Sequence, residues 1–364
     1  MSDRLYMATR KGLFTAAREG TNSWSIVSST FVGDSVTMLL DDARDGTLYA
    51  ALNLGHFGVK LHRSEDRGKT WEECAAPAFA NEPTEKDGKS DGPSVHQVWE
   101  LTAGGTDQPG RLWAGTIPGG LFVSDDRGGS WSLVESLWNR PERESWFGGG
   151  YDDPGIHSIC IHPEDHDHLT VGVSCGGVWV SRDGTATWEV RTQGMYATYM
   201  PPERREDPSI QDPHCLAHCP AHPEVLWVQH HNGMFRSTDG GLNWSELEAA
   251  PSNFGFAVVA HPDDPETAWF VPAVKDDCRV PVDGKLVVTR TRDGGKTFDV
   301  LRDGLPQEHA YDLVFRHALA IDRSGERLAF GSTTGSAWAS EDGGERWTTI
   351  SRHLPPVYQV LFAN

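Results

Sequence analysis

The sequence predicts an all-β protein, a propeller of seven four-stranded blades. A short turn motif recurs along the chain at intervals of 49 to 60 residues. Glycine (39 residues), proline (22) and tryptophan (14) are abundant among the 364 residues, which favours short strands joined by tight turns. The chain lacks any long stretch with the apolar spacing of a helix. Together these observations favour many small sheets built from one repeating unit.

The repeated motif reads Ser/Thr-x-Asp-x-Gly-x-x-Trp/Phe. Its copies begin at Ser64, Ser124, Ser181, Ser237, Thr291 and Ser340. In the copy at Ser181, Thr185 stands where the others have glycine. The aspartate of such a turn can accept backbone N–H bonds, and the glycine can adopt the positive φ that the turn needs. We therefore assign the motif a structural role in a hairpin.

This motif resembles the Asp-boxes, or BNR repeats, of the sialidase-like propeller superfamily. The resemblance covers most of the chain and implies the propeller fold. It also implies that the boxes lie on the face away from an active site.

The spacing of the motif leaves room for four strands in each blade, within a single domain of residues 1–364. Residues 4–31 keep the tryptophan of a box, Trp24, but lack its aspartate, and they supply only three strands. We expect residues 357–362 to add the missing inner strand, which would close the ring and remove exposed sheet edges. The predicted blades are 357–362 with 4–31, 34–77, 94–137, 155–192, 212–249, 252–302 and 309–352.

Composition restricts the partners of the protein. The formal net charge of −20 offers no basic surface, so we expect binding neither to nucleic acid nor to a membrane. No run of eighteen apolar residues and no signal-peptide pattern occurs, which predicts a cytoplasmic protein. The six cysteines have no CxxC spacing and are expected to be thiols rather than a disulfide framework.

Long polar linkers at 77–93, 139–154 and 194–213 should lie together on one face of the propeller, where we expect the function. Aligning the first strand of each blade places one residue of each blade in a ring: Thr37, His96, His157, His214, Phe256, Tyr311 and Tyr358. Imidazoles from three consecutive blades suit a divalent metal such as zinc, iron or copper. We therefore predict a metal centre formed by His96, His157 and His214. The alternative is that these histidines only line a water-filled channel.

Other residues near this ring are candidates for contact with a substrate. Tyr311 and Tyr358 would form the opposite, catalytic wall. The glycine-rich segment 145–154 would act as a lid over the ring. The candidates for substrate binding are Trp146, Tyr151, Arg10, His230, His231 and Phe256.

The predicted function is that of an enzyme acting on a small-molecule or sugar-like substrate. The chain departs from the pattern expected of a working sialidase, because no inner strand begins with arginine and no glutamate partner for a tyrosine is identifiable. A glycoside hydrolase remains the first alternative, for which the candidate catalytic carboxylates are Asp152, Asp153, Asp212, Glu308 and Asp312. A non-catalytic propeller that binds other proteins is the second.

Overall fold

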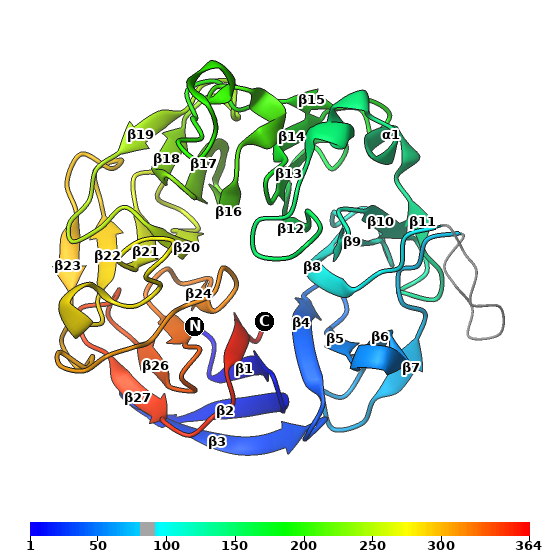
Figure 1. Cartoon of the computed structure of the whole chain (residues 1–364). Coiled ribbons are helices and arrows are strands. Elements are labelled where there is room, and N and C mark those ends of the chain that lie inside the picture. Colours follow the sequence, from blue (N-terminus) through cyan, green and yellow to red (C-terminus); the bar gives the residue numbers. More distant parts are fainter. Residues whose placement is uncertain (81–91) are drawn as a thin grey trace.

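The computed structural model describes residues 1–80 and 92–364, so most of the predicted linker 77–93 lies outside the described residues. Seven four-stranded antiparallel sheets stand in a ring around a central axis (Figure 1). This arrangement confirms the predicted all-β, seven-bladed propeller. The first strand of each sheet lies nearest the axis, and the N and C labels both fall inside the ring.

The blades follow one another along the chain, each in the order inner to outer strand. The strands are β28 (Val357–Phe362), β1 (Arg4–Thr9), β2 (Gly12–Gly20) and β3 (Ser23–Thr30); β4 (Ser35–Asp42), β5 (Thr47–Asn53), β6 (Val59–Ser64) and β7 (Glu72–Cys74); β8 (Gln97–Ala103), β9 (Leu112–Ile117), β10 (Leu121–Ser124) and β11 (Ser132–Leu133); β12 (Ile156–Ile161), β13 (Leu169–Val173), β14 (Gly177–Ser181) and β15 (Glu189–Val190); β16 (Pro213–Cys219), β17 (His222–His230), β18 (Gly233–Ser237) and β19 (Ser245–Leu247); β20 (Gly255–Ala260), β21 (Ala268–Pro272), β22 (Val288–Thr291) and β23 (Asp299–Leu301); β24 (Leu319–Ile321), β25 (Leu328–Gly331), β26 (Ala337–Ser340) and β27 (Thr348–Ser351). The described helices are α1 (Glu135–Trp138) and the 3-10 segments η1 (Gly55–Phe57), η2 (Pro141–Ser145), η3 (Pro202–Arg204), η4 (Pro208–Ile210) and η5 (Val282–Gly284). None of the helices in these residues is long and apolar enough to span a bilayer.

The C-terminal strand closes the ring as predicted. Strand β28 pairs antiparallel with β1, so that Leu5 lies opposite Phe362 and Met7 lies opposite Val360. The Gln359 side chain reaches the next blade, where its Nε2 donates to the Leu39 carbonyl at 3.2 Å. Strands from the two chain ends thus share one sheet, and β28 covers the inner hydrogen-bonding edge of β1.

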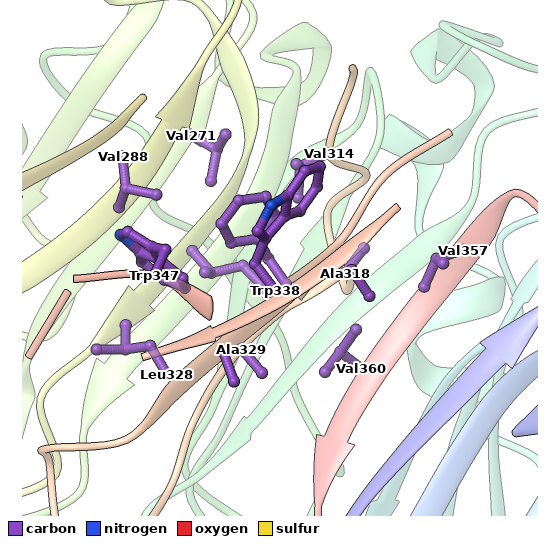
Figure 2. Close-up of a cluster of buried hydrophobic side chains, with 14 of the residues drawn as sticks. Val271, Val288, Val314, Ala318, Leu328, Ala329, Trp338, Trp347, Val357 and Val360 are labelled. Carbon is purple, nitrogen blue, oxygen red and sulfur yellow. The ribbon is translucent and has the colours of Figure 1, made fainter. Parts of the chain in front are cut away.

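The hydrophobic core lies between neighbouring blades rather than inside any one of them. Every residue of β13 is buried, because the sheet has another blade on each face. Figure 2 shows one such cluster, in which Val288, Trp338 and Val360 come from three successive sheets. Each large apolar side chain buried there contributes about 1.5 to 3 kcal/mol relative to an exposed one. Packing between blades therefore holds the ring together.

The Asp-boxes form the turns between the third and fourth strands. At Asp239, Oδ1 accepts from the Ser237 hydroxyl (2.8 Å) and the Asn243 amide (2.9 Å). The Ser237 hydroxyl accepts in turn from the Gly241 amide at 2.9 Å. The same Ser-to-Gly link spans four residues at Ser64 and Ser340. The boxes thus satisfy the backbone of tight turns at the ends of the blades opposite the linkers between blades.

Candidate functional site

A cavity of about 420 Å³ opens on the face that carries the linkers between blades and the turns between second and third strands. Its walls come from the blades that begin with β12, β16, β20 and β24, which are neighbours around the axis in Figure 1. The lining residues are Phe147, Gly148, Gly149, Gly150, Tyr151, Ser174, Cys175, Tyr199, Asp212, His214, His231, Phe256, Asp276, Arg279, Phe315 and Arg316. The cavity is therefore both aromatic and charged.

Bulges in the inner strands decide which side chains face one another near the axis. The pairing of β16 with β17 shifts between Pro213 and Cys215, so His214 is the bulged residue. Strand β12 shifts in the same way around His157. A bulge kinks its strand locally and redirects the side chain it carries. These local irregularities set the site, and sequence spacing gives little sign of them.

Three ligand-type side chains converge at the cavity: Asp212, His214 and His231. One ligand atom from each lies within 4.8 Å of the other two. The Asp212 Oδ2 atom is 3.4 Å from His214 Nε2 and 3.4 Å from His231 Nδ1. A charge-assisted N–H···O bond is usually about 2.7 to 2.9 Å. Tetrahedral ligands about 2.0 to 2.1 Å from a zinc ion stand roughly 3.3 to 3.4 Å apart, so the observed spacing suits metal ligands better than hydrogen bonds.

The remaining polar atoms of these side chains face partners of their own. His214 Nδ1 is 2.7 Å from the Gly255 carbonyl, which can only accept, so Nδ1 carries a proton and Nε2 is the atom that faces Asp212. Asp212 Oδ1 accepts from the Cys175 amide at 3.0 Å and from the Ser174 hydroxyl at 3.2 Å. His231 Nε2 faces Asp276 Oδ2 at 4.0 Å. Support of this kind orients metal ligands in proteins.

A backbone amide and two imidazoles surround the Asp212 carboxylate. Cys175 has φ of 47°, a left-handed conformation that is uncommon for residues other than glycine, and its amide donates to this carboxylate. Burial by itself would raise the pKa of Asp212, but the imidazoles of His214 and His231 outweigh it and hold that pKa well below its usual value. The ring of Phe256 lies parallel to that of His214, with centroids 4.4 Å apart, and fixes its plane.

The predicted metal trio does not come together. His157 is fully buried, and its Nδ1 lies 2.9 Å from the Ser158 hydroxyl. The segment before β24 covers it from blade seven, because His317 Nε2 is 2.6 Å from the His157 carbonyl. Burial lowers the pKa of His157 well below its usual value, so this imidazole is neutral. Among the described residues, only the group of Asp212, His214 and His231 brings three such ligands together.

His96 lies elsewhere because the repeat alignment fails in its blade. The shift in the pairing of β8 with β9 falls between Val98 and Glu100, so Trp99 is the residue equivalent to His157 and His214. His96 precedes this strand and is largely exposed, with Nδ1 3.7 Å from Asp153 Oδ2. A bulge three residues further along the chain is the physical reason for the difference.

Three of the residues predicted for substrate binding do line the cavity: Tyr151, His231 and Phe256. Trp146 is instead buried against Trp179, with ring centroids 5.8 Å apart. The nitrogens of the buried His230 ring lie 3.0 and 3.1 Å from the amides of Asp212 and Asn232, so this ring supports the turn rather than the cavity.

The remaining predicted residues lie outside the lining of this cavity. Arg10 and Asp152 are exposed, and Tyr311 is 63% exposed. Tyr358 is partly buried, and its ring centroid lies 6.0 Å from that of Phe315. Sequence reasoning gave no site role to Cys175, Asp276, Arg279 or Arg316. Asp276, Arg279 and Arg316 lie in irregular loops that no repeat pattern marks. By contrast, the Asp-x-His sequence at 212–214 is a pattern that indicates a metal site.

Fold and site together define a seven-bladed propeller with a polar cavity on one face. The family model described as BNR-Asp box repeat matches residues 61–74 and 121–134. Together with the four further boxes, these matches identify repeats of the BNR Asp-box type on a propeller fold. No curated protein matches the chain.

Solved structures with the same fold include proteins of different function. The GH74 xyloglucanase from Xanthomonas campestris is 17% identical, with a TM-score of 0.61 over 97% of this chain and 53% of that one. An ancestral GH74 enzyme is 15% identical, with a TM-score of 0.58 over 84% of this chain and 36% of that one. YCF48 from Cyanidioschyzon merolae is 14% identical, with a TM-score of 0.53 over 88% of this chain and 87% of that one. The chain thus spans about a third to a half of the GH74 enzymes, and likeness at these identities establishes the fold alone.

Proposed function

We propose that this protein is a metal-dependent enzyme that acts on a small polar or sugar-like molecule in the cavity. Asp212, His214 and His231 would hold the metal. The observation that carries the proposal is that Asp212 Oδ2 lies 3.4 Å from one nitrogen of each imidazole, while the outer atoms of Asp212 and His214 are bound to other groups. Two imidazoles and one carboxylate suit zinc or ferrous iron and leave coordination positions open.

The cavity provides the setting that such chemistry needs. A metal held by three protein ligands can polarise a substrate oxygen or lower the pKa of a bound water. Aromatic rings of Phe256 and Tyr199 pack against the two imidazoles, with centroid distances of 4.4 and 4.9 Å, and limit water around them. Gly149 brings the loop close, since a Cβ at this position would stand 3.4 Å from Asp212 Oδ2. The site is thus enclosed on several sides and open to the cavity.

Metal analysis tests this proposal directly. Protein stripped with a chelator and titrated with Zn²⁺ or Fe²⁺ should bind one ion per chain. The His214→Ala and Asp212→Asn variants should lose more than about 100-fold in affinity, because each removes a direct ligand. His96→Ala is the matched control, since this histidine is exposed on the same face but outside the group. Absence of stoichiometric metal, or equal losses in His96→Ala and His214→Ala, would overturn the proposal.

A glycoside hydrolase is the second candidate, and one observation favours it. Asp212 and Asp276 approach the two nitrogens of His231 at 3.4 and 4.0 Å, so two carboxylates face the cavity. Glycosidases use such a pair as acid and base or nucleophile. Hydrolysis of an aryl glycoside that survives chelation but is lost in Asp276→Asn would support this candidate over the metal-dependent one.

A further inference from the structure

Arg316 reaches the cavity from the blade that begins with β24, two blades away from His214. It lies in the irregular segment before β24, and its Nε donates to the His214 carbonyl at 2.6 Å. Its guanidinium carbon lies 4.2 Å from the centre of the Trp99 ring, which belongs to a third blade. Stacking and hydrogen bonding thus hold this cation in one orientation, directly beside the residue that offers a ligand nitrogen.

The charge of Arg316 has no carboxylate partner. Among the described residues, no Asp or Glu oxygen forms an ion pair with it within 4.0 Å, and its two terminal nitrogens have no hydrogen-bond acceptor. Burial lowers the pKa of Arg316, an effect that the charge of Asp212 opposes from a greater distance. If Asp212 binds a metal, even this compensation is reduced. Arg316 is only partly buried, but it is the guanidinium of the cavity wall that lacks a counter-charge among the described residues, and a bound anion would supply one.

Two buried arginines of this chain show the usual arrangement. Arg290 pairs with Asp299 and Glu345 at 2.9 and 2.6 Å. Arg191 pairs with Glu189 at 2.8 Å. Arg316 and Arg143 depart from this pattern, since each stacks on a tryptophan ring without an ion pair to any described residue, but only Arg316 of these two lies in the wall of the cavity. We infer that a bound ligand, rather than a side chain of this protein, supplies the counter-charge of Arg316.

A second arginine, Arg279, lines the same wall, where its guanidinium is paired with the Asp276 carboxylate. The guanidinium carbons of Arg279 and Arg316 lie 5.3 and 5.9 Å from the centre of the Phe256 ring. That ring is itself stacked on His214. An anion between these cations would therefore stand next to the group of Asp212, His214 and His231. Both arginines belong to a chain whose overall charge is strongly negative, so the positive charge is local.

We propose that the substrate of this site is a small carboxylate whose carboxyl group binds end-on to the two terminal nitrogens of Arg316. An oxygen on the neighbouring carbon, as in a 2-hydroxy acid, would face the Asp212, His214 and His231 group. This inference rests on the proposed function, because it places the second oxygen at the metal. A planar carboxylate matches the two parallel N–H donors that remain once Nε is bonded to His214.

Calorimetric titration with glycolate tests the inference. Zinc-loaded protein should bind glycolate, whereas glycolamide, which has the same shape without the charge, should bind far more weakly. Arg316→Gln should weaken glycolate binding roughly 10- to 100-fold, because it removes a charge-assisted pair of hydrogen bonds. Arg352→Gln is the matched control, since Arg352 is exposed in the linker between β27 and β28 and does not line the cavity. Arg316→Lys keeps the positive charge but loses the planar guanidinium, so we expect an intermediate loss of glycolate affinity. Arg279→Gln should also weaken glycolate binding, and it leaves the segment before β24 unchanged.

The outcomes separate this inference from the proposed function. Zinc content is measured in the wild type and in Arg316→Gln, and both should hold one ion. If both hold zinc and bind glycolate equally well, the carboxylate inference fails while the metal site stands. Binding of inorganic phosphate in preference to glycolate would also overturn it. If the wild type holds no zinc, the proposed function fails on that measurement alone. If Arg316→Gln does not fold, unchanged binding by Arg316→Lys and Arg279→Gln would overturn the inference.

Discussion

Thr185 offers a direct test of the structural role of the Asp-boxes. It occupies the fifth position of the box that begins at Ser181, and its φ is 73°. The glycines at this position in the other boxes have φ between 81° and 94°. A β-branched residue in this left-handed region is strained, whereas glycine is not. We therefore expect Thr185→Gly to stabilise the protein.

The size of the effect follows from two opposing terms. The left-handed conformation of an L-residue destabilises the folded state by roughly 1 to 2 kcal/mol, and glycine would remove this strain. Glycine also increases the conformational entropy of the unfolded chain, which lowers the free energy of unfolding by about 0.5 to 1 kcal/mol. The backbone bonds of Thr185 would survive, since its amide donates to the Ser181 hydroxyl at 2.9 Å and its carbonyl accepts from Ser136 at 2.5 Å. The net gain should be about 0.5 to 1 kcal/mol in the free energy of unfolding.

Equilibrium unfolding in urea measures this gain, and thermal unfolding should show a rise of roughly 2 °C or less for a chain of this size. The reverse change, Gly241→Thr, is the matched control. A Cβ at Gly241 would meet its nearest neighbours at 3.5 Å, an ordinary contact, so its cost should come from φ alone. A Thr185→Gly variant that is no more stable than the wild type would refute the reasoning.

Two further predictions concern the cavity and pH. Gly149→Val should lower metal affinity about 10- to 100-fold, because the added side chain would crowd Cys175 and Asp212. Gly150→Ala is the control, since a Cβ at Gly150 would have open space around it and should leave metal affinity unchanged. Equal metal affinity in the two variants would contradict this account. Burial lowers the pKa of His218 and of His168 to about 4, against about 6.5 in the unfolded chain. The unfolded chain thus binds more protons between pH 6.5 and 4, so stability is full above pH 6.5 and falls on acidification by up to about 1.4 kcal/mol per pH unit for each histidine. Urea unfolding at pH 7 and pH 5 should show a smaller difference for His218→Gln than for the wild type, and an identical difference would count against the assignment.

The ring of histidines shows where prediction from the sequence failed. His157 and His214 do occupy equivalent bulges, but the alignment placed His96 at the position that Trp99 holds. Bulges depend on how two strands pair, and a pattern of alternating residues does not fix their register. His157 does not line the cavity for another reason, because its imidazole is fully buried, with Nδ1 2.9 Å from the Ser158 hydroxyl.

The sequence alone determined the blades, their turns and the closure of the ring. These features depend on local chemistry: an aspartate, a hydroxyl and a glycine within five residues make each box, and the tryptophan that follows them marks each repeat. Tertiary structure decided which side chains meet at the axis. Asp212, His231 and Arg316 come from loops of different length, and only the packing of whole blades brings them to one cavity. Turn geometry depends on near neighbours in sequence, whereas the site depends on contacts across the propeller.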